Sequence, residues 1–436
     1  MRRGPALPHR PQPALREENL DTSNRVGGAP SPRSWRTPGF VVACGCLIAM
    51  LAFGPRSSMG LFTAPLSEAH GWGRDVFALS IAIQNLVWGI GTPFAGALCD
   101  RYGPALVLGI SGVLYALGLA LMPYADTPLM LHLSSGLLIG LGLAGASFGI
   151  VIAGFSRIVP PEKRSWSMGV ATAAGSMGQF LFAPTGQAFI AAYGWQTALI
   201  LFGASMLVIP VLASSFAGAG GSKSAQAVTG ADIGFAATIR QAFKHRSYVL
   251  LVTGFFVCGF QLAFITTHLP PYLTAAGISP GLASWAMALI GLFNVVGSYM
   301  SGVLGGKMSK RLLLCANYTL RGLCTALFIL LPVTPVSVIL YAAAMGLLWL
   351  STVPPTSGLV VLMFGTRYLG MLYGFAFLSH QVGGFLGVWL GGVLYERVGS
   401  YDVVWWASVA LAFAAAVVNW PITEKPAPAL AAEAKA

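Results

Sequence analysis

The chain has 436 residues, of which 56% are hydrophobic and only 9% are charged, and its mean hydropathy is +0.74. A soluble domain carries about 25% charged residues, so this composition excludes a soluble protein and predicts an all-α polytopic membrane protein. The net charge of +12 at pH 7 would suit nucleic-acid binding, but the positions of the charges argue against it. The six cysteines lie mostly in apolar runs, which indicates packing residues rather than disulfides or a metal site.

The first segment, residues 1–37, is rich in Pro and Arg and has no hydrophobic periodicity. Such a segment cannot bury enough apolar surface to fold, so we predict a disordered basic cytoplasmic tail. It is not expected to be a cleavable signal, because no short apolar stretch with a cleavage site follows it.

Apolar runs follow, each long enough for one crossing at about 20 residues. Twelve are predicted, at residues 38–66, 75–98, 104–123, 128–156, 165–190, 195–216, 247–274, 280–305, 312–332, 335–363, 370–394 and 402–421. The one long break, 217–246, is predicted to be a cytoplasmic linker that ends in a surface helix from Ile233 to Phe243. It separates an N-terminal six-helix bundle, 38–216, from a C-terminal one, 247–422, and residues 423–436 form a cytoplasmic tail.

Positive charge follows the predicted topology. Most of the 25 Lys and Arg residues fall in the tails, in the linker and in the turns on the same side as the linker. The positive-inside rule therefore predicts a multi-pass protein with both termini in the cytoplasm. The Ala-, Gly- and Arg-rich composition favours a bacterial inner membrane. The basic charge is then a consequence of topology, and the expected partner is the lipid bilayer rather than nucleic acid.

A short charged turn separates the second and third runs, and it recurs later in the chain. It reads Gly96-Ala-Leu-Cys-Asp100-Arg101-Tyr-Gly103-Pro, and a weaker copy begins 206 positions later at Gly302. The two glycines of the first copy are predicted to let helix ends approach closely and let the chain reverse. Recurrence at a nearly constant offset indicates two parallel six-helix repeats, as in transporters whose halves rock about a central site.

The turn, its degenerate copy and the division into six plus six helices resemble the major facilitator superfamily. In that family the turn locks and releases the two halves during alternating access. By this resemblance Gly96, Asp100, Arg101 and Gly103 are conformational-gate residues rather than substrate ligands. The second copy has Gly306 where the Asp would be.

Two further stretches, Gly71-Trp-Gly-Arg-Asp75 and Gly365 to Gly370, resemble the monocarboxylate-porter and oxalate/formate-exchanger branch of that family. The resemblance implies a small carboxylate as substrate. The sequence departs from the branch in one respect: the branch carries a cation in helix 8 and its exchangers a Lys in helix 11, whereas residues 280–305 and 370–394 contain no charge.

Two cations are predicted to lie inside the membrane, Arg56 in the first run and Arg321 in the ninth. Each costs about 2.5–3.5 kcal/mol to insert, and none of the 13 Asp and Glu residues lies deep in a run. A planar guanidinium binds a carboxylate through two parallel hydrogen bonds, so unpaired cations favour a small organic anion as substrate. The alternative for each Arg is a structural one, in which it snorkels or binds helix-end carbonyls.

Other polar residues in the runs are candidates for the same cavity. Gln261, Asn294, His380 and Gln381 are predicted substrate ligands, and His380 and His268 are the candidates for proton coupling, because histidine titrates near neutral pH. No catalytic, metal or cofactor motif occurs, so an enzyme is not expected.

The leading hypothesis is a secondary active transporter, functional as a monomer, that moves a monocarboxylate-like anion by alternating access, either as a proton symporter or as an anion-exchanging antiporter. The alternatives are an efflux pump for lipophilic compounds and a non-transporting membrane receptor.

Overall fold

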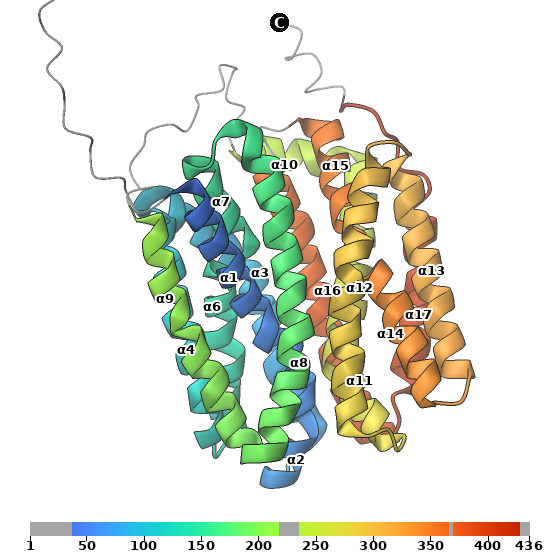
Figure 1. Cartoon of the computed structure of the whole chain (residues 1–436). Helices are drawn as coiled ribbons and strands as arrows, with labels where there is room; N and C mark the ends of the chain where they lie inside the picture. The colour runs from blue at the N-terminus through green and yellow to red at the C-terminus, as the bar shows by residue number, and fades with distance from the viewer. Residues whose placement is uncertain (1–36, 218–234, 366–368, 428–436) are drawn as a thin grey trace, which may run out of the picture. The chain divides into compact units, whose positions relative to one another are not determined.

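The computed structural model describes residues 37–217, 235–365 and 369–427. All regular secondary structure in these residues is helical, and they contain no strand (Figure 1). Most of the predicted N-terminal tail, much of the linker, part of the Gly365–Gly370 stretch and the C-terminal end lie outside the described residues.

The first part of the chain forms α1 (Pro38–Ser57), η1 (Met59–Phe62), α2 (Thr63–His70), α3 (Arg74–Tyr102), α4 (Pro104–Leu121), η2 (Met122–Tyr124), α5 (Pro128–Leu131), η3 (His132–Leu138), α6 (Ile139–Gly145), α7 (Phe148–Ile158), α8 (Pro161–Met206), α9 (Val208–Ala213) and η4 (Ser214–Phe216).

The second part begins with α10, the counterpart of the predicted surface helix. Its helices are α10 (Phe235–Lys244), α11 (Arg246–Ala275), α12 (Pro280–Gly305), α13 (Lys310–Leu330), α14 (Pro335–Leu348), α15 (Val353–Phe364), α16 (Leu369–Val398) and α17 (Asp402–Asn419). Several crossings contain more than one helix, because a 3-10 turn, a π turn or a short break interrupts them.

Eleven helical segments among the described residues are long and apolar enough to span a membrane. One of them, Trp166–Phe216, has 51 residues, far more than one crossing needs. Within it Gly194 has φ 81° and ψ 162°, a conformation in which the helix cannot continue. The segment is therefore two crossings joined at Gly194, and the twelve predicted crossings are confirmed.

The buried residues form two apolar cores, and nearly all members of each core come from one half of the chain. Phe77, Tyr115 and Phe202 belong to the first core, and Phe264 and Trp405 to the second. Each half therefore buries its own helices, as two six-helix bundles require.

The two halves contact each other mainly along two helix pairs, α3 with α16 and α8 with α12, and η1 and α2 of the first half also contact α11. Small residues allow this approach: a Cβ on Gly89 of α3 would come within 2.7 Å of the Gln381 side chain of α16. On the other seam, Gly291 of α12 packs against the main chain of Phe180 in α8. Candidate ligands placed on these four helices therefore lie where the halves meet.

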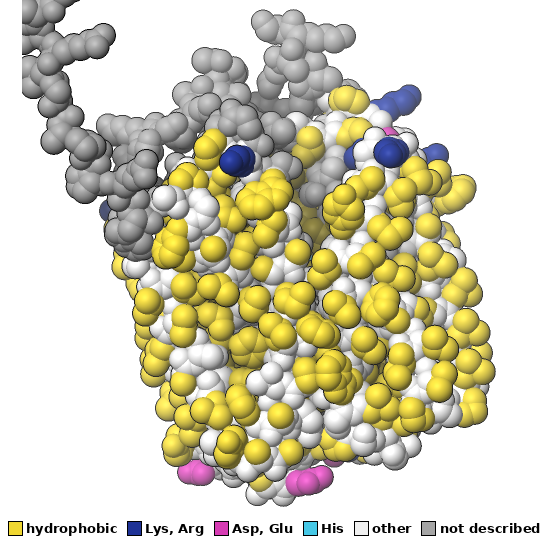
Figure 2. Space-filling model, viewed as in Figure 1, with side chains coloured by type: hydrophobic (Ala, Val, Ile, Leu, Met, Phe, Trp, Pro, Cys, Tyr) yellow, Lys and Arg dark blue, Asp and Glu magenta, His cyan; other side chains and the backbone are white. Residues whose placement is uncertain are grey.

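Charges mark the two ends of the helices and an apolar belt lies between them. On the face seen in Figure 2, the visible Lys and Arg lie at one end, and most of the visible Asp and Glu surface lies at the other. We call the first the linker end, which holds α10 and the Asp100–Arg101 turn, and the second the far end, which holds Gly71–Gly73 and Glu396–Asp402. Exposed Lys and Arg at the linker end include Arg101, Lys163, Arg240, Lys244, Arg246 and Lys307.

Close packing of α16 on α11 gives a stability test with a control in the same helix. A Cβ on Gly383 would overlap the main-chain carbonyl of Phe256, whereas one on Gly374 would meet nothing within 4 Å. We expect Gly383→Ala to lower the free energy of unfolding by about 1–3 kcal/mol through overpacking. Gly374→Ala should keep or raise it, because Ala favours helix by about 1 kcal/mol over Gly. Thermal unfolding of purified protein checks the pair, and equal melting temperatures would contradict the packing described.

Candidate functional site

Arg56 lies in the last turn of α1, and its side chain contacts α3. Its Nη2 donates a hydrogen bond of 2.6 Å to Oδ1 of Asn85, and its Cζ lies 4.7 Å from the centroid of the Trp88 ring. Nearby, the carbonyl of Gly54 accepts from the hydroxyls of Ser57 and Ser58. That helix-end acceptor is already occupied, so Arg56 binds a side-chain amide and an aromatic face.

Two N–H donors at this point have no acceptor within the described part of the chain. They are Nε of Arg56 and Nε1 of Trp88, and both atoms are buried. A buried donor without an acceptor costs about 1–3 kcal/mol. An acceptor that also carries negative charge would therefore be stabilised beside them.

A chain of polar contacts connects this arginine to the other half of the molecule. Oδ1 of Asn85 accepts the hydrogen bond from Arg56, and Nδ2 of the same side chain donates to the carbonyl of Ile81 at 2.9 Å. The main-chain carbonyl of Asn85 accepts from Nε2 of Gln381 at 3.1 Å, across the contact between α3 and α16. Oε1 of Gln381 lies 2.9 Å from Nδ1 of His380. Three sequence-predicted residues, Arg56, Gln381 and His380, are thus brought together.

Aromatic rings surround this polar chain. The Trp88 ring centroid is 6.0 Å from that of Phe53 and 5.3 Å from that of Phe377. Phe53 packs on Phe148 at 4.6 Å, and Phe377 lies 5.9 Å from His380 with their planes 10° apart. We call Phe53, Trp88, Phe148, Phe377 and His380 the aromatic cluster. It draws on α1, α3, α7 and α16, hence on both halves.

Arg56 and four of the five rings are partly exposed, while Trp88 is 5% exposed. Sequence reasoning missed Phe53, Trp88 and Phe377. Helical spacing carried a signal for them: Phe53 lies three residues before Arg56, Trp88 three after Asn85, and Phe377 three before His380. Residues three or four apart share a helix face.

Acidic residues lie away from this site. Every Asp and Glu whose side chain the structure describes is in a loop or close to a helix end: Glu68, Asp75, Asp126, Glu396 and Asp402 toward the far end, and Asp100 and Glu424 toward the linker end. The guanidinium of Arg56 therefore has a neutral amide as its hydrogen-bond partner.

Arg321 is placed differently, and the structure does not bring it to Arg56. It is fully buried in α13, where Nε and Nη2 donate to the carbonyl of Leu348 at 3.0 and 2.6 Å and Nη2 also donates to the carbonyl of Trp349. Nη1 lies 3.4 Å from Sγ of Cys258. The two carbonyls stand at the break between α14 and α15, just before Pro354 and Pro355, where the helical ladder is interrupted. This geometry favours the structural alternative for Arg321.

Two other predicted ligands also connect helices. Nε2 of Gln261 donates to the carbonyl of Ser408 in α17 at 3.1 Å. Asn294 bridges the halves, since its Nδ2 donates to Oγ of Ser176 in α8 at 2.9 Å and its Oδ1 accepts from the main-chain N–H of Leu350 at 3.0 Å. Neither bonds to Arg56, Gln381 or His380.

His268, the second proton-coupling candidate, lies near the far end and apart from the aromatic cluster. Its Nε2 is 2.9 Å from the carbonyl of Val388, so that nitrogen donates, and its Nδ1 is 3.3 Å from the hydroxyl of Tyr401. Burial raises the pKa of Tyr401 to about 12, so the phenol is protonated at neutral pH and is able to donate to His268. The histidine therefore joins α11 to α16 and to the loop before α17.

The same tyrosine takes part in a contact between the two halves. Nη1 of Arg74, at the start of α3, donates to the hydroxyl of Tyr401 at 3.2 Å, and its main-chain N–H donates to Oε1 of Glu396 at 2.8 Å. Its Cζ lies 4.1 Å from the centroid of the Tyr395 ring. We call Arg74, Tyr395, Glu396 and Tyr401 the far-end clasp. Sequence reasoning used Arg74 only as part of a family-like stretch and missed this role.

At the linker end, the predicted gate turn is exposed. Gly103 has φ 88°, which confirms the predicted chain reversal, and Cζ of Arg101 lies 5.2 Å from the ring centroid of Tyr102. Asp100 and Arg101 are both exposed. The prediction that Gly96 serves a close helix approach was wrong for this conformation, because a Cβ there would meet nothing within 4 Å.

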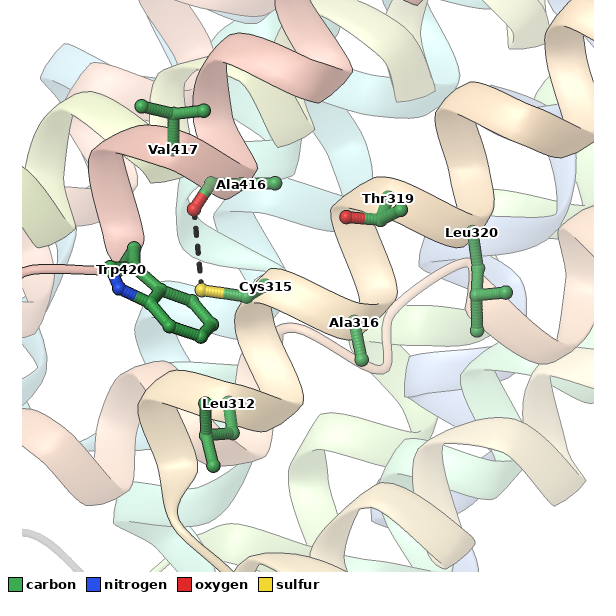
Figure 3. Close-up of a pocket in the computed structure, with 8 residues that line it drawn as sticks. All are labelled: Leu312, Cys315, Ala316, Thr319, Leu320, Ala416, Val417 and Trp420. Atoms are coloured by element: carbon green, nitrogen blue, oxygen red, sulfur yellow. Dashed lines mark hydrogen bonds between the residues drawn. The ribbon is translucent and has the colours of Figure 1, made fainter.

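An apolar groove lies elsewhere in the described part of the chain. It has a volume of about 720 Å³ and lies between α13 and α17, and its lining includes Leu312, Cys315, Leu320, Val417 and Trp420 (Figure 3). Cys315 Sγ donates to the carbonyl of Ala416 at 3.2 Å. The lining is apolar and contains none of the predicted ligands, so it is not the anion site.

Comparison with known proteins gives one family. The profile of the Major Facilitator Superfamily matches residues 45–388 and 278–436. An uncharacterized MFS-type transporter of Bacillus subtilis, YcxA, is 24% identical over 80% of the chain and 86% of its own length. Monocarboxylate transporter 13 of Rattus norvegicus is 28% identical over 80% and 81%, and a probable sulfoacetate transporter of Cupriavidus necator is 27% identical over 82% and 84%.

Solved structures agree on the fold. A bacterial homologue of the human lysosomal transporter Spinster superposes with a TM-score of 0.70 at 13% identity, covering 91% of this chain and 100% of that one. A D-xylose–proton symporter gives 0.68 at 14% identity, with 88% and 97% covered. These relatives and folds are those of transporters, not enzymes.

The contacts of Arg321 predict a stability defect. In Arg321→Gln the carbonyls of Leu348 and Trp349 lose charge-assisted donors, so we expect unfolding free energy to fall by about 1.5–3 kcal/mol. Arg397→Gln removes an exposed charge at the end of α16 and should leave the melting temperature unchanged. If both variants melt together, Arg321 does not stabilise the helix break.

The far-end clasp predicts a change of conformation rather than of stability. Arg74→Met keeps an apolar stem but loses the donors to Tyr401, so we expect the far ends of the halves to separate more often. Spin labels at Leu129 and Val336, both exposed near the far end, would report a longer distance population in a cysteine-free background. Arg397→Gln is the control, and an unchanged distance distribution in Arg74→Met would refute the clasp.

Proposed function

We propose that this protein transports a small organic anion of the monocarboxylate type. The chain belongs to the Major Facilitator Superfamily and is a multi-pass membrane transporter. Transport is secondary active and proceeds by alternating access, with the protein working as a monomer. The names of its relatives, a monocarboxylate transporter and a probable sulfoacetate transporter, support an organic acid.

One observation carries the proposal: the buried, unpaired Nε of Arg56 beside the unpaired Nε1 of Trp88. A carboxylate placed there would receive one hydrogen bond from a cation and one from the indole. Charge-assisted bonds of this kind are worth about 1.5–3 kcal/mol each. The described acids lie near helix ends, so none competes for Arg56 at its own depth.

Coupling is proposed to involve His380, which lies next to Gln381 and is partly exposed. In a symport mechanism His380 carries the proton on its imidazole ring. In an exchange mechanism it carries none, and a second anion returns through the same site. We propose His268 for neither role in this conformation, since both of its nitrogens are occupied.

Alternating access is proposed to use two gates. The far-end clasp holds the halves together at one end, and the exposed Asp100–Arg101 turn, with Gly96 and Gly103, acts at the linker end. We propose that the basic linker end and both termini lie in the cytoplasm, which the positive-inside rule supports, and that the protein lies in the inner membrane of a bacterium.

Uptake into proteoliposomes tests the proposal. Labelled monocarboxylates should accumulate in vesicles with wild-type protein, and Arg56→Gln should lower uptake by at least about tenfold, because it removes the charge-assisted donors. Arg397→Gln, exposed at the far end, should transport normally. Normal uptake by Arg56→Gln would overturn the anion site.

Uptake into the same vesicles also distinguishes proton symport from anion exchange. An inward proton gradient that stimulates uptake in the wild type, but not in His380→Gln, supports symport. Stimulation by preloaded anion without a gradient supports exchange.

A further inference from the structure

We infer that the preferred substrate is a monoanion whose carboxylate is attached to a flat apolar body, that is, an aryl carboxylate rather than a short hydrophilic acid. This inference rests on the proposed function, because it concerns what occupies the space next to Arg56. The inference names a class of substrate, whereas Arg56 alone would indicate only that the substrate is an anion.

The site combines polar N–H donors, on Arg56 and Trp88, with apolar rings around them. Arg56 and Trp88 each have a buried N–H donor without a partner in the described part of the chain, and Cζ of Arg56 lies 4.7 Å from the centroid of the Trp88 ring. Around them stand Phe53, Phe148 and Phe377. A ligand that satisfies the donors with one end therefore places its other end against carbon.

The arrangement of the rings favours a flat guest. Trp88 meets Phe53 at 75° and Phe377 at 73°, so edges and faces alternate around the indole. Aromatic groups prefer offset or edge-to-face neighbours with centroids about 4.5–7 Å apart, and a guest ring would extend this pattern. A saturated ring of equal size would bury similar area without these contacts.

The same surround disfavours polar substrates. A second carboxylate on the ligand would be desolvated against phenyl rings, and the guanidinium of Arg321 is already bonded to the carbonyls of the α14–α15 break. Burying an uncompensated charge is strongly unfavourable. A short hydroxy acid would bind through its carboxylate but leave the apolar space unfilled.

The aromatic cluster contains rings from both halves. The preference for aryl carboxylates should therefore depend on a residue other than Arg56 and Trp88, the two residues proposed to bind the carboxylate. Phe377 belongs to α16, while Arg56 and Trp88 belong to α1 and α3. Phe377→Leu would remove ring contacts and retain apolar bulk, without touching the donors. Phe94 of α3 is 66% exposed, so Phe94→Leu is a matched control.

Binding measured on the purified full-length protein tests the inference. The probes are benzoate and phenylacetate, cyclohexanecarboxylate as the saturated match, acetate and lactate as short acids, succinate as a dianion, and benzyl alcohol as the uncharged match. We expect the aryl acids to bind about threefold to tenfold more tightly than cyclohexanecarboxylate, as ring–ring contacts allow. They should exceed the short acids and succinate by more.

The variants separate the two claims. In Phe377→Leu the advantage of benzoate over cyclohexanecarboxylate should disappear, while acetate binds as in the wild type and Phe94→Leu changes nothing. If all monocarboxylates bind equally and Arg56→Gln abolishes binding, the aryl preference is overturned and the anion site stands. If benzyl alcohol binds as well as benzoate, in wild type and Arg56→Gln alike, the proposed function fails and this inference with it.

Discussion

The absence of water in the bilayer core decides what each buried donor does in this protein. A donor at that depth must find its acceptor inside the protein, because lipid provides none. Arg321 meets this demand with the carbonyls of Leu348 and Trp349, which the break between α14 and α15 leaves without helical partners. Arg56 meets it only in part, through Asn85, and its Nε remains without a partner in the described structure. One arginine is thereby structural, and the other is suited to bind.

The sequence was sufficient for the fold because crossing a membrane imposes a length and a composition that a single run of residues displays. The twelve crossings and the two-bundle division followed from such runs, and even Gly194 stood between two of them. The roles of the two arginines did not follow. Arg321 was expected to face a cavity, but its acceptors are main-chain carbonyls of a helix break, and main-chain carbonyls leave no mark in the sequence.

Tertiary placement also decided the rest of the site. Gln381 and His380 were identified as polar residues in an apolar run, yet their connection to Arg56 depends on a main-chain carbonyl of Asn85 in the other half. Phe53 and Phe377 were indistinguishable from packing residues until their distances to Trp88 were known. The far-end clasp pairs Arg74 with residues more than 300 positions later, a pairing that no local pattern specifies.

The partnership of Arg321 has a consequence for how the protein is made. α13 leaves the ribosome before α14 and α15, so the guanidinium enters the membrane before its two acceptor carbonyls have been synthesised. During that interval its insertion cost of about 2.5–3.5 kcal/mol is carried by α13 alone. This cost is offset only when the tenth crossing brings the carbonyls of Leu348 and Trp349 to the guanidinium.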